Sequence, residues 1–203
     1  MLRAVGGWLQ ENGLADLPWD ESLRQWQQRI LCLRGQFGDD SELPDVSDDW
    51  LKHNLEQWLV PFLPAITHRR QLRKLDLKAA LHSLLPWPLP QQLDELAPTH
   101  IKVPSGSNIA LDYLHSPPVL AVKLQEMFGQ KTTPTIAGGR LPLVLHLLSP
   151  ARRPLQVTQD LESFWQNGYA DVKRELKGRY PKHPWPNDPL SAAPRRGTKR
   201  QGV

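Results

Sequence analysis

Residues 141–148 read LPLVLHLL, an apolar run interrupted by Pro142 and His146. Successive side chains of a strand point to opposite faces of a sheet, so a run that is apolar at nearly every position indicates a strand buried on both faces. The run is far shorter than the roughly 20 residues that a membrane-spanning helix requires. We therefore expect it to lie within a sheet in the second half of the chain.

The sequence on either side of this run also favours strands. Residues 101–103 and 109–113 flank a Pro-Ser-Gly-Ser stretch, which predicts a hairpin with Gly106 in its turn. Residues 135–136 are predicted to pair with the apolar run across a Gly-Gly turn, and residues 155–157 are predicted to form another strand.

Three helices are expected among these strands. Residues 118–128 follow two prolines and end before Gly129, and the spacing of their apolar residues predicts a helix. Residues 160–165 and 169–176 are predicted to be two helices separated at Gly168. After them, residues 180–186 are too rich in proline for a helix or a central strand, so we expect an extended arm that its aromatic rings dock on the surface.

The first half of the chain is predicted to be helical, because its apolar residues are spaced by three and four. Asp20, Ser47 and Asp76 stand at helix starts, where a short polar side chain caps the free backbone N–H groups. Helices are expected over residues 2–9, 21–37, 48–59, 77–85 and 91–96.

These elements together predict an α+β fold, with a helical N-terminal half followed by a small mixed β-sheet subdomain covered by helices. The expected organisation is a helical subdomain at residues 1–98, an α+β subdomain at residues 99–190 and a disordered basic tail at residues 191–203.

The two halves of the chain differ in net charge as well as in predicted secondary structure. The net charge is +4, yet residues 1–100 carry 10 basic and 14 acidic side chains, whereas residues 101–203 carry 15 basic and 7 acidic. The excess gathers in residues 151–203, with 11 basic against 5 acidic side chains, so a polyanion, if one binds, is expected to meet the C-terminal end. The alternative is a basic surface that only keeps the protein in solution. With one cysteine, no apolar run long enough to cross a bilayer and no secretion signal, we expect a cytoplasmic protein without membrane contact.

Candidate catalytic and metal-binding residues are few. Cys32 lies in an apolar helical segment, so we interpret it as a core residue rather than a nucleophile. The seven histidines show no metal-ligand spacing. Gly138-Gly139-Arg140 could offer N–H groups to a phosphate, but a tight turn is the favoured interpretation because no phosphate-binding loop motif is present. We expect neither a catalytic residue nor a metal site in this chain.

One cluster combines cations with aromatic rings, as nucleic-acid-binding surfaces do, where cations neutralise phosphates and rings stack on bases. The alternative for the rings is that they fill the core beneath the proline arm. The candidate nucleic-acid-binding residues are Arg152, Arg153, Lys173, Arg174, Lys177, Arg179, Lys182 and Trp185.

Several motifs occur in order and resemble the C-terminal region of bacterial HrpB-type helicases, which belong to the DEAH-box group of ATP-dependent RNA helicases. They are PSGS (104–107), PVLAVKLQEMFG (118–129), LHLLSPA (145–151), QVTQDL (156–161), FW (164–165) and GRYPKHPWP (178–186). Weaker matches upstream are GL (13–14), LPW (17–19), AAL (79–81) and LLPW (84–87).

The resemblance implies an accessory region of an RNA helicase that binds nucleic acid weakly through its basic face. It also implies that ATP and Mg²⁺ bind a nucleotide-binding core that this chain lacks, so that no cofactor and no enzymatic activity of its own are expected. The implied partners are RNA and the helicase core of the same polypeptide. An alternative is a protein-docking module that braces the core or recruits another protein, with Trp165, Tyr180 and Trp185 as anchors.

Overall fold

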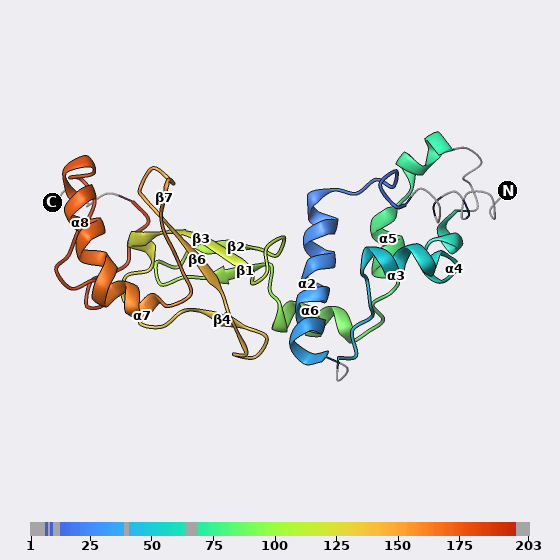
Figure 1. Ribbon diagram of the computed structural model, residues 1–203, viewed down its shortest axis with the longest axis horizontal. Coiled ribbons are helices and arrows are strands. Elements are labelled where there is room, and N and C mark those ends of the chain that lie inside the picture. Colours follow the sequence, from blue (N-terminus) through green and yellow to red (C-terminus); the bar gives the residue numbers. More distant parts are fainter. Residues whose placement is uncertain (1–6, 8, 10–12, 39–40, 64–68, 198–203) are drawn as a thin grey trace. The chain divides into compact units, whose positions relative to one another are not determined.

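A computed structural model describes residues 7, 9, 13–38, 41–63 and 69–197 of the 203-residue chain. The chain forms two compact units that divide between Ala97 and Pro98. We call them the helical unit and the sheet unit, and Figure 1 shows their elements. The α+β fold expected from the sequence is confirmed. The predicted boundary after residue 98 lies one residue from this division.

The helical unit is built around α2 (Glu21–Phe37), whose apolar stripe of Leu23, Trp26, Ile30 and Leu33 is buried as predicted. The Asp20 carboxylate accepts a hydrogen bond from the Leu23 N–H at 2.7 Å and caps the first turn. The other described elements of this unit are α3 (Asp48–His53), α4 (Leu55–Trp58), the 3₁₀ segments η2 (Val60–Phe62) and η3 (Arg69–Lys74), α5 (Leu77–His82) and α6 (Leu89–Leu96).

The single helix expected from Ser47 to Pro61 is divided at Asn54. Ser47 caps α3 as predicted, accepting from the Trp50 N–H at 3.2 Å. At the end of α3, the side-chain amide and the backbone N–H of Asn54 both donate to the Trp50 carbonyl, at 2.8 and 3.0 Å. Residues 1–6, 8 and 10–12 of the predicted first helix lie outside the described residues, whereas Gly13 has the left-handed φ of 83° expected of a residue that ends a helix.

Two buried polar side chains hold α2 against its neighbours. Arg29, 6% exposed, donates to the Ala97 carbonyl at 2.7 Å and forms a 2.6 Å ion pair with Asp94. Gln27, 1% exposed, donates to the Val46 carbonyl and to Asp48. Because an unpaired buried polar group is costly, these bonds select the positions of α6 and α3 along α2.

The sheet unit contains a five-stranded mixed sheet in the order β1-β2-β3-β6-β7. Its strands are β1 (His100–Lys102), β2 (Asn108–Asp112), β3 (Val119–Lys123), β6 (Val144–Leu148) and β7 (Pro154–Thr158). β1 and β2 form the predicted antiparallel hairpin, with Gly106 at a φ of 79° in its turn. β6 pairs in parallel with β3 and antiparallel with β7, so it lies inside the sheet. Only the face of Leu145 and Leu147 is fully buried, whereas the other face is half-buried, so the prediction of burial on both faces is met only in part.

The run at residues 141–148 contains two strands rather than one. Leu141–Pro142 forms β5, which pairs with β4 (Thr135–Ile136) across Gly138-Gly139 in a separate two-stranded sheet. Both glycines have positive φ, 63° and 89°, so this segment is the tight turn that we favoured over a phosphate-binding loop.

The helix predicted over residues 118–128 is wrong. This segment is strand β3 followed by the 3₁₀ turn η4 (Leu124–Glu126). Leu120, Leu124 and Met127 have the spacing of a helical stripe, whereas Leu120, Val122 and Leu124 alternate as the residues on one face of a strand do. All of these residues are buried. Parallel pairing with β6, which sets Leu120 opposite Leu145, decides between the two possibilities.

The turn between β1 and β2 is tied to η4 by a buried carboxylate. Glu126 is 7% exposed and accepts hydrogen bonds from the Ser105 hydroxyl at 2.7 Å and from the Ser107 hydroxyl at 2.5 Å. The Ser105 N–H donates to the Glu126 backbone carbonyl at 3.2 Å. These three bonds hold residues 104–107 against the end of β3.

The two helices predicted on either side of Gly168 form one continuous helical segment. α7 (Leu161–Ser163) leads into a π-helical turn, η5 (Phe164–Gly168), and then into α8 (Tyr169–Arg179). Gly168 lies in the π-helical turn, where a Cβ atom would come within 2.9 Å of the Phe164 ring. The glycine therefore gives room for Phe164 instead of ending the helix.

Part of the segment expected to be a disordered tail makes defined contacts. The Arg195 N–H donates to the Gln125 carbonyl at 2.9 Å, and the Arg196 guanidinium donates to the Ser105 carbonyl at 3.2 Å. These bonds hold residues 195–196 against η4 and the β1–β2 turn. Residues 198–203 of the expected tail lie outside the described residues.

The packing of Phe164 in the π-helical turn requires glycine at position 168. Gly168→Ala is expected to lower the free energy of unfolding by about 1–3 kcal/mol, because the new Cβ meets the buried Phe164 ring. Gly178→Ala, in α8, is the matched control: nothing lies within 4 Å of a Cβ added there, so it is expected to be neutral or to stabilise by up to about 1 kcal/mol. Urea denaturation of both variants checks this. Equal effects would contradict the packing role of Gly168.

His82 makes the helical unit sensitive to acid. Its ring stacks on Trp26 with centroids 4.9 Å apart, and desolvation, followed by the charge of Lys78, lowers its pKa below the ordinary 6.5. A folded state that binds fewer protons than the unfolded state loses stability as pH falls. The melting temperature is therefore expected to fall as pH is lowered from 6.5 toward the depressed pKa, and His82→Gln should flatten this slope.

His100→Gln, at an exposed position in β1, is the control for the loss of one histidine. It should leave the slope of melting temperature against pH unchanged. An unaltered slope in His82→Gln would show that His82 does not cause the acid sensitivity.

Candidate nucleic-acid interface

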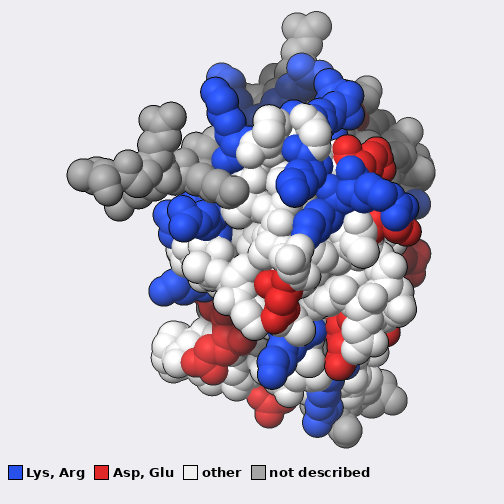
Figure 2. Space-filling model, turned by 90° about the vertical axis from the view of Figure 1, so that its left-hand side faces the viewer, with Lys and Arg blue, Asp and Glu red and all other residues white. Residues whose placement is uncertain are grey.

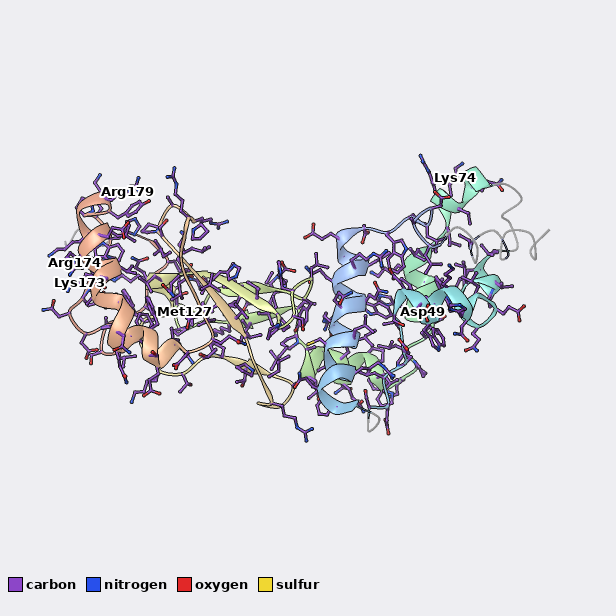
Figure 3. All side chains as sticks on the ribbon, viewed as in Figure 1. Asp49, Lys74, Met127, Lys173, Arg174 and Arg179 are labelled. Carbon is purple, nitrogen blue, oxygen red and sulfur yellow. The ribbon has the colours of Figure 1, made fainter. Side chains whose placement is uncertain are left out.

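Five of the eight candidate residues lie on α8 or directly after it. Tyr169 and Leu176 form the buried side of this helix. Lys173 and Lys177 are four residues apart, and Arg174 is three from Lys177, so these three cations share one flank. Figure 3 shows Lys173 and Arg174 on the outer side of α8.

The other flank of α8 is of mixed charge. Asp171 and Glu175, four residues apart, lie on it, and Arg179 follows Glu175 by four at the C-terminal end. Figure 3 shows Arg179 at that end. The cations of α8 therefore do not form one ring around the helix but a three-residue flank, Lys173, Arg174 and Lys177, and a separate terminal position.

Few of the candidate cations are neutralised by acids. Arg174 forms a 2.6 Å ion pair with Asp171, in which both side chains are largely exposed, and such a pair contributes little to stability. Lys173 donates to the neutral Asn187 side chain at 2.5 Å. In the part of the chain that the structure describes, Arg152, Arg153, Lys177, Arg179 and Lys182 form no ion pair, and all five are exposed.

Arg152 and Arg153 lie at the tip of the β6–β7 hairpin. The Arg152 N–H donates to the Ser149 carbonyl at 2.8 Å, and the Ser149 hydroxyl accepts from the Arg153 N–H at 3.0 Å. Arg152 has a φ of 61°, a left-handed conformation that costs a non-glycine residue free energy. The turn thus holds two adjacent guanidinium groups at an exposed tip.

The hairpin tip lies on the same side of the sheet unit as the C-terminal end of α8, whereas Figure 3 shows Lys173 and Arg174 midway along that helix. Figure 1 shows the hairpin tip and the C-terminal end of α8 at the same, upper side of this unit. Figure 2 faces α8, and there Lys and Arg gather over the upper part of the surface while acidic residues lie mainly below it. The arrangement fits a surface that contacts a chain of phosphates.

The aromatic rings of the candidate cluster lie in the core. Trp165 and Tyr169 are 7% and 3% exposed and pack around Phe128, with ring centroids 6.2 Å from it in both cases. The Trp165 indole N–H donates to the Gln130 carbonyl at 2.7 Å. Burial also raises the pKa of the Tyr169 hydroxyl, which donates to the Pro186 carbonyl at 3.0 Å.

Trp185 holds the proline arm in place, so a role as an open stacking platform does not fit its position. It is 8% exposed, and its indole N–H donates to the Tyr180 carbonyl at 3.0 Å. The burial of Trp165 and Trp185 likewise removes two of the three anchors expected for protein docking, whereas Tyr180 stays half-buried beside His183.

Other candidate chemistry finds no support in the geometry. Burial raises the pKa of the Cys32 thiol to about 11, which disfavours the thiolate that a nucleophile needs. Among the described residues, no group of three His, Cys, Asp or Glu side chains could hold a metal ion, and no helix there is long and apolar enough to cross a membrane. The Gly138-Gly139-Arg140 segment lies in the turn of the β4–β5 hairpin.

Sequence reasoning missed two cationic residues near the proline arm. Arg195 was placed in the expected disordered tail, yet it lines a cavity with Pro184 and Trp185. Lys123 was placed on the wrongly predicted helix, and in the structure it acts electrostatically on His183. The only sequence signal for this grouping is the pair of arginines at 195–196.

A family model described as ATP-dependent helicase C-terminal matches residues 58–189. The chain is 48% identical over 193 residues to the ATP-dependent RNA helicase HrpB of Escherichia coli K12, an alignment that covers 95% of this chain and 24% of that protein. It therefore spans about a quarter of the length of this curated relative.

Two solved structures are similar to this one. The crystal structure of the E. coli DExH-box NTPase HrpB matches with a TM-score of 0.86 at 47% identity, over 97% of this chain and 24% of that one. A crystal structure of the E. coli DEAH/RHA helicase HrpB matches with a TM-score of 0.73 at 45% identity, over 91% and 23%.

The burial of Trp185 leads to a test that separates a core ring from a surface ring. Trp185→Ala is expected to lower the free energy of unfolding by about 3–5 kcal/mol, because it leaves a void beneath the proline arm. Trp87→Ala removes a ring that is 76% exposed and should change stability by no more than about 0.5 kcal/mol. Urea denaturation measures both. A Trp185→Ala variant as stable as Trp87→Ala would refute the core assignment.

Proposed function

The chain belongs to the C-terminal family of HrpB-type ATP-dependent helicases, and from this premise we propose that its sheet unit binds single-stranded RNA through two groups of cations. The first is the α8 flank of Lys173, Arg174 and Lys177. The second is the hairpin tip of Arg152 and Arg153. Arg179 and Lys182, at the end of α8 and after it, extend the first group.

The proposal is carried by five exposed cations that form no ion pair among the described residues, Arg152, Arg153, Lys177, Arg179 and Lys182. Arg174 of the flank is paired with Asp171, but both side chains are largely exposed, so this pair contributes little. A cation already paired with a carboxylate has less to gain from a phosphate, whereas a free one releases the counterions condensed on RNA when it binds. The sheet unit supplies such cations from two elements, the β6–β7 hairpin and α8. The charge excess in residues 101–203, 15 basic against 7 acidic, favours an anionic partner for this unit.

The burial of the rings indicates how the strand is held. Because Trp165 and Tyr169 are in the core, the exposed surface of α8 and the hairpin tip offers charge rather than stacking. Contacts to phosphates carry no sequence information. The cations would therefore hold RNA of any sequence, which suits an accessory region of a helicase whose substrate moves along it.

Hydrolysis of ATP is assigned to the part of full-length relatives that this chain does not span. The E. coli relative is named an ATP-dependent RNA helicase, and this chain aligns with 24% of it. On this view ATP and Mg²⁺ bind the helicase core, the sheet unit contacts the RNA, and both act within one polypeptide in the cytoplasm.

Charge reversal tests the proposal. Lys173→Glu/Lys177→Glu and Arg152→Glu/Arg153→Glu are each expected to weaken binding of a labelled single-stranded RNA at least about tenfold at low salt, because each removes two phosphate contacts and adds repulsion. The slope of log K against log salt should also become shallower by about 1.4, roughly 0.7 for each contact. Fluorescence anisotropy at several KCl concentrations gives both quantities.

Arg73→Glu/Lys74→Glu is the matched control. It reverses two exposed cations of the helical unit, and Figure 3 labels Lys74, so the net charge changes by the same amount in another part of the chain. RNA binding should stay near the unmodified level. If all three double variants lose the same affinity, net charge alone attracts RNA and the assigned surface is wrong.

A further inference from the structure

A cavity of about 290 Å³ lies in the sheet unit between the proline arm and the chain end. The arm lines it with Pro184, Trp185 and Pro186. The segment that follows lines it with Ala192, Ala193 and Arg195. Its volume is at the lower end of the range of roughly 300–1,000 Å³ for small-molecule sites. The cavity therefore suits one ring system rather than a folded segment.

The walls of this cavity combine flat apolar surfaces with one guanidinium group. Two proline rings, two alanine methyl groups and the 8% of Trp185 that stays exposed are apolar contacts that a planar base can use. The Arg195 side chain is exposed and forms no ion pair among the residues described, and its backbone N–H bond to the Gln125 carbonyl, 2.9 Å long, fixes the position of residue 195. An apolar slot with a free cation at its edge matches a ring that carries an anionic substituent.

The surroundings are positive as well. His183 directly precedes Pro184, and its pKa is lowered by burial and by the ammonium group of Lys123. Lys123 ends β3, two residues before the Gln125 carbonyl that holds Arg195. The nearest acid in the sequence after the arm is Asp188. Its carboxylate accepts hydrogen bonds from the Leu190 N–H and the Ser191 hydroxyl.

We propose that this cavity takes one unpaired nucleotide of a bound single strand, with the base against Pro184, Pro186 and the small part of Trp185 that stays exposed, and the phosphate at Arg195. The inference rests on the proposed RNA-binding function and adds a base-dependent contact to it. The cations of α8 and the hairpin tip hold the sugar-phosphate backbone of the RNA. The cavity makes a strand that carries bases bind more tightly than a strand that lacks them.

The test compares two ligands of equal charge. One is a short single-stranded RNA, and the other is a strand of the same length and backbone that lacks bases. The unmodified protein is expected to bind the intact strand about tenfold more tightly, the contribution typical of one stacked base. Ala192→Leu, which narrows the cavity, should reduce the affinity for the intact strand to that for the abasic strand.

Further variants keep the result interpretable. Ala193→Leu narrows the cavity from an exposed position and repeats the test if Ala192→Leu fails to fold. Arg195→Gln should weaken binding of the intact strand more than that of the abasic strand. Ala170→Leu adds the same side chain on exposed α8, outside the cavity, and should leave the preference for bases unchanged.

Two outcomes separate this inference from the proposed function. Equal binding of intact and abasic strands by the unmodified protein, with the salt dependence retained, would overturn the cavity and leave the cationic surface standing. Binding of neither strand would overturn both. A base preference that survives both cavity-narrowing variants in folded protein would also overturn the assignment.

Discussion

The parallel pairing of β3 with β6 is the constraint on which the sheet unit depends. Five register pairs, from Val119 with Val144 to Lys123 with Leu148, join the two strands. Because the strands are parallel, their carboxyl ends meet at the same edge of the sheet. β3 leads there into η4, which holds the chain end, and β6 leads into the turn that carries Arg152 and Arg153. The pairing of β3 with β6 thus brings the hairpin tip, with its two guanidinium groups, to one edge of the sheet. The same edge holds η4, which contacts the segment that lines the proposed nucleotide-binding cavity.

Much of the fold could be predicted where local signals agree with tertiary packing. α2 has an N-cap, a regular apolar stripe and a buried face, and each indicates the same helix. β3 shows the opposite case, because its segment holds a strand pattern in Leu120, Val122 and Leu124 and a helical pattern in Leu120, Leu124 and Met127. The choice between them is made by β6, more than 20 residues away along the chain, and no local pattern contains that information.

The candidate site also has features that could be predicted from the sequence and features that could not. That most of the candidate cations are exposed could be predicted, because lysine and arginine need no partner to stay at the surface; their binding role stays a prediction. The positions of the rings could not be predicted, because a tryptophan next to cations serves equally well as a stacking surface or as core. The contacts of residues 195 and 196 also escaped prediction, since they depend on backbone carbonyls at Gln125 and Ser105 rather than on an apolar pattern.

The bonds between Glu126 and the two serines of the β1–β2 turn couple the energetic effects of changing them. Both hydroxyls donate to the same buried carboxylate oxygen, so loss of either serine removes one of its two hydroxyl donors. Loss of the carboxylate leaves the two hydroxyls with each other as partners. Glu126 lies about 20 residues from both serines in the sequence, yet substitutions at the three positions are expected to be non-additive, because they share one hydrogen-bond network.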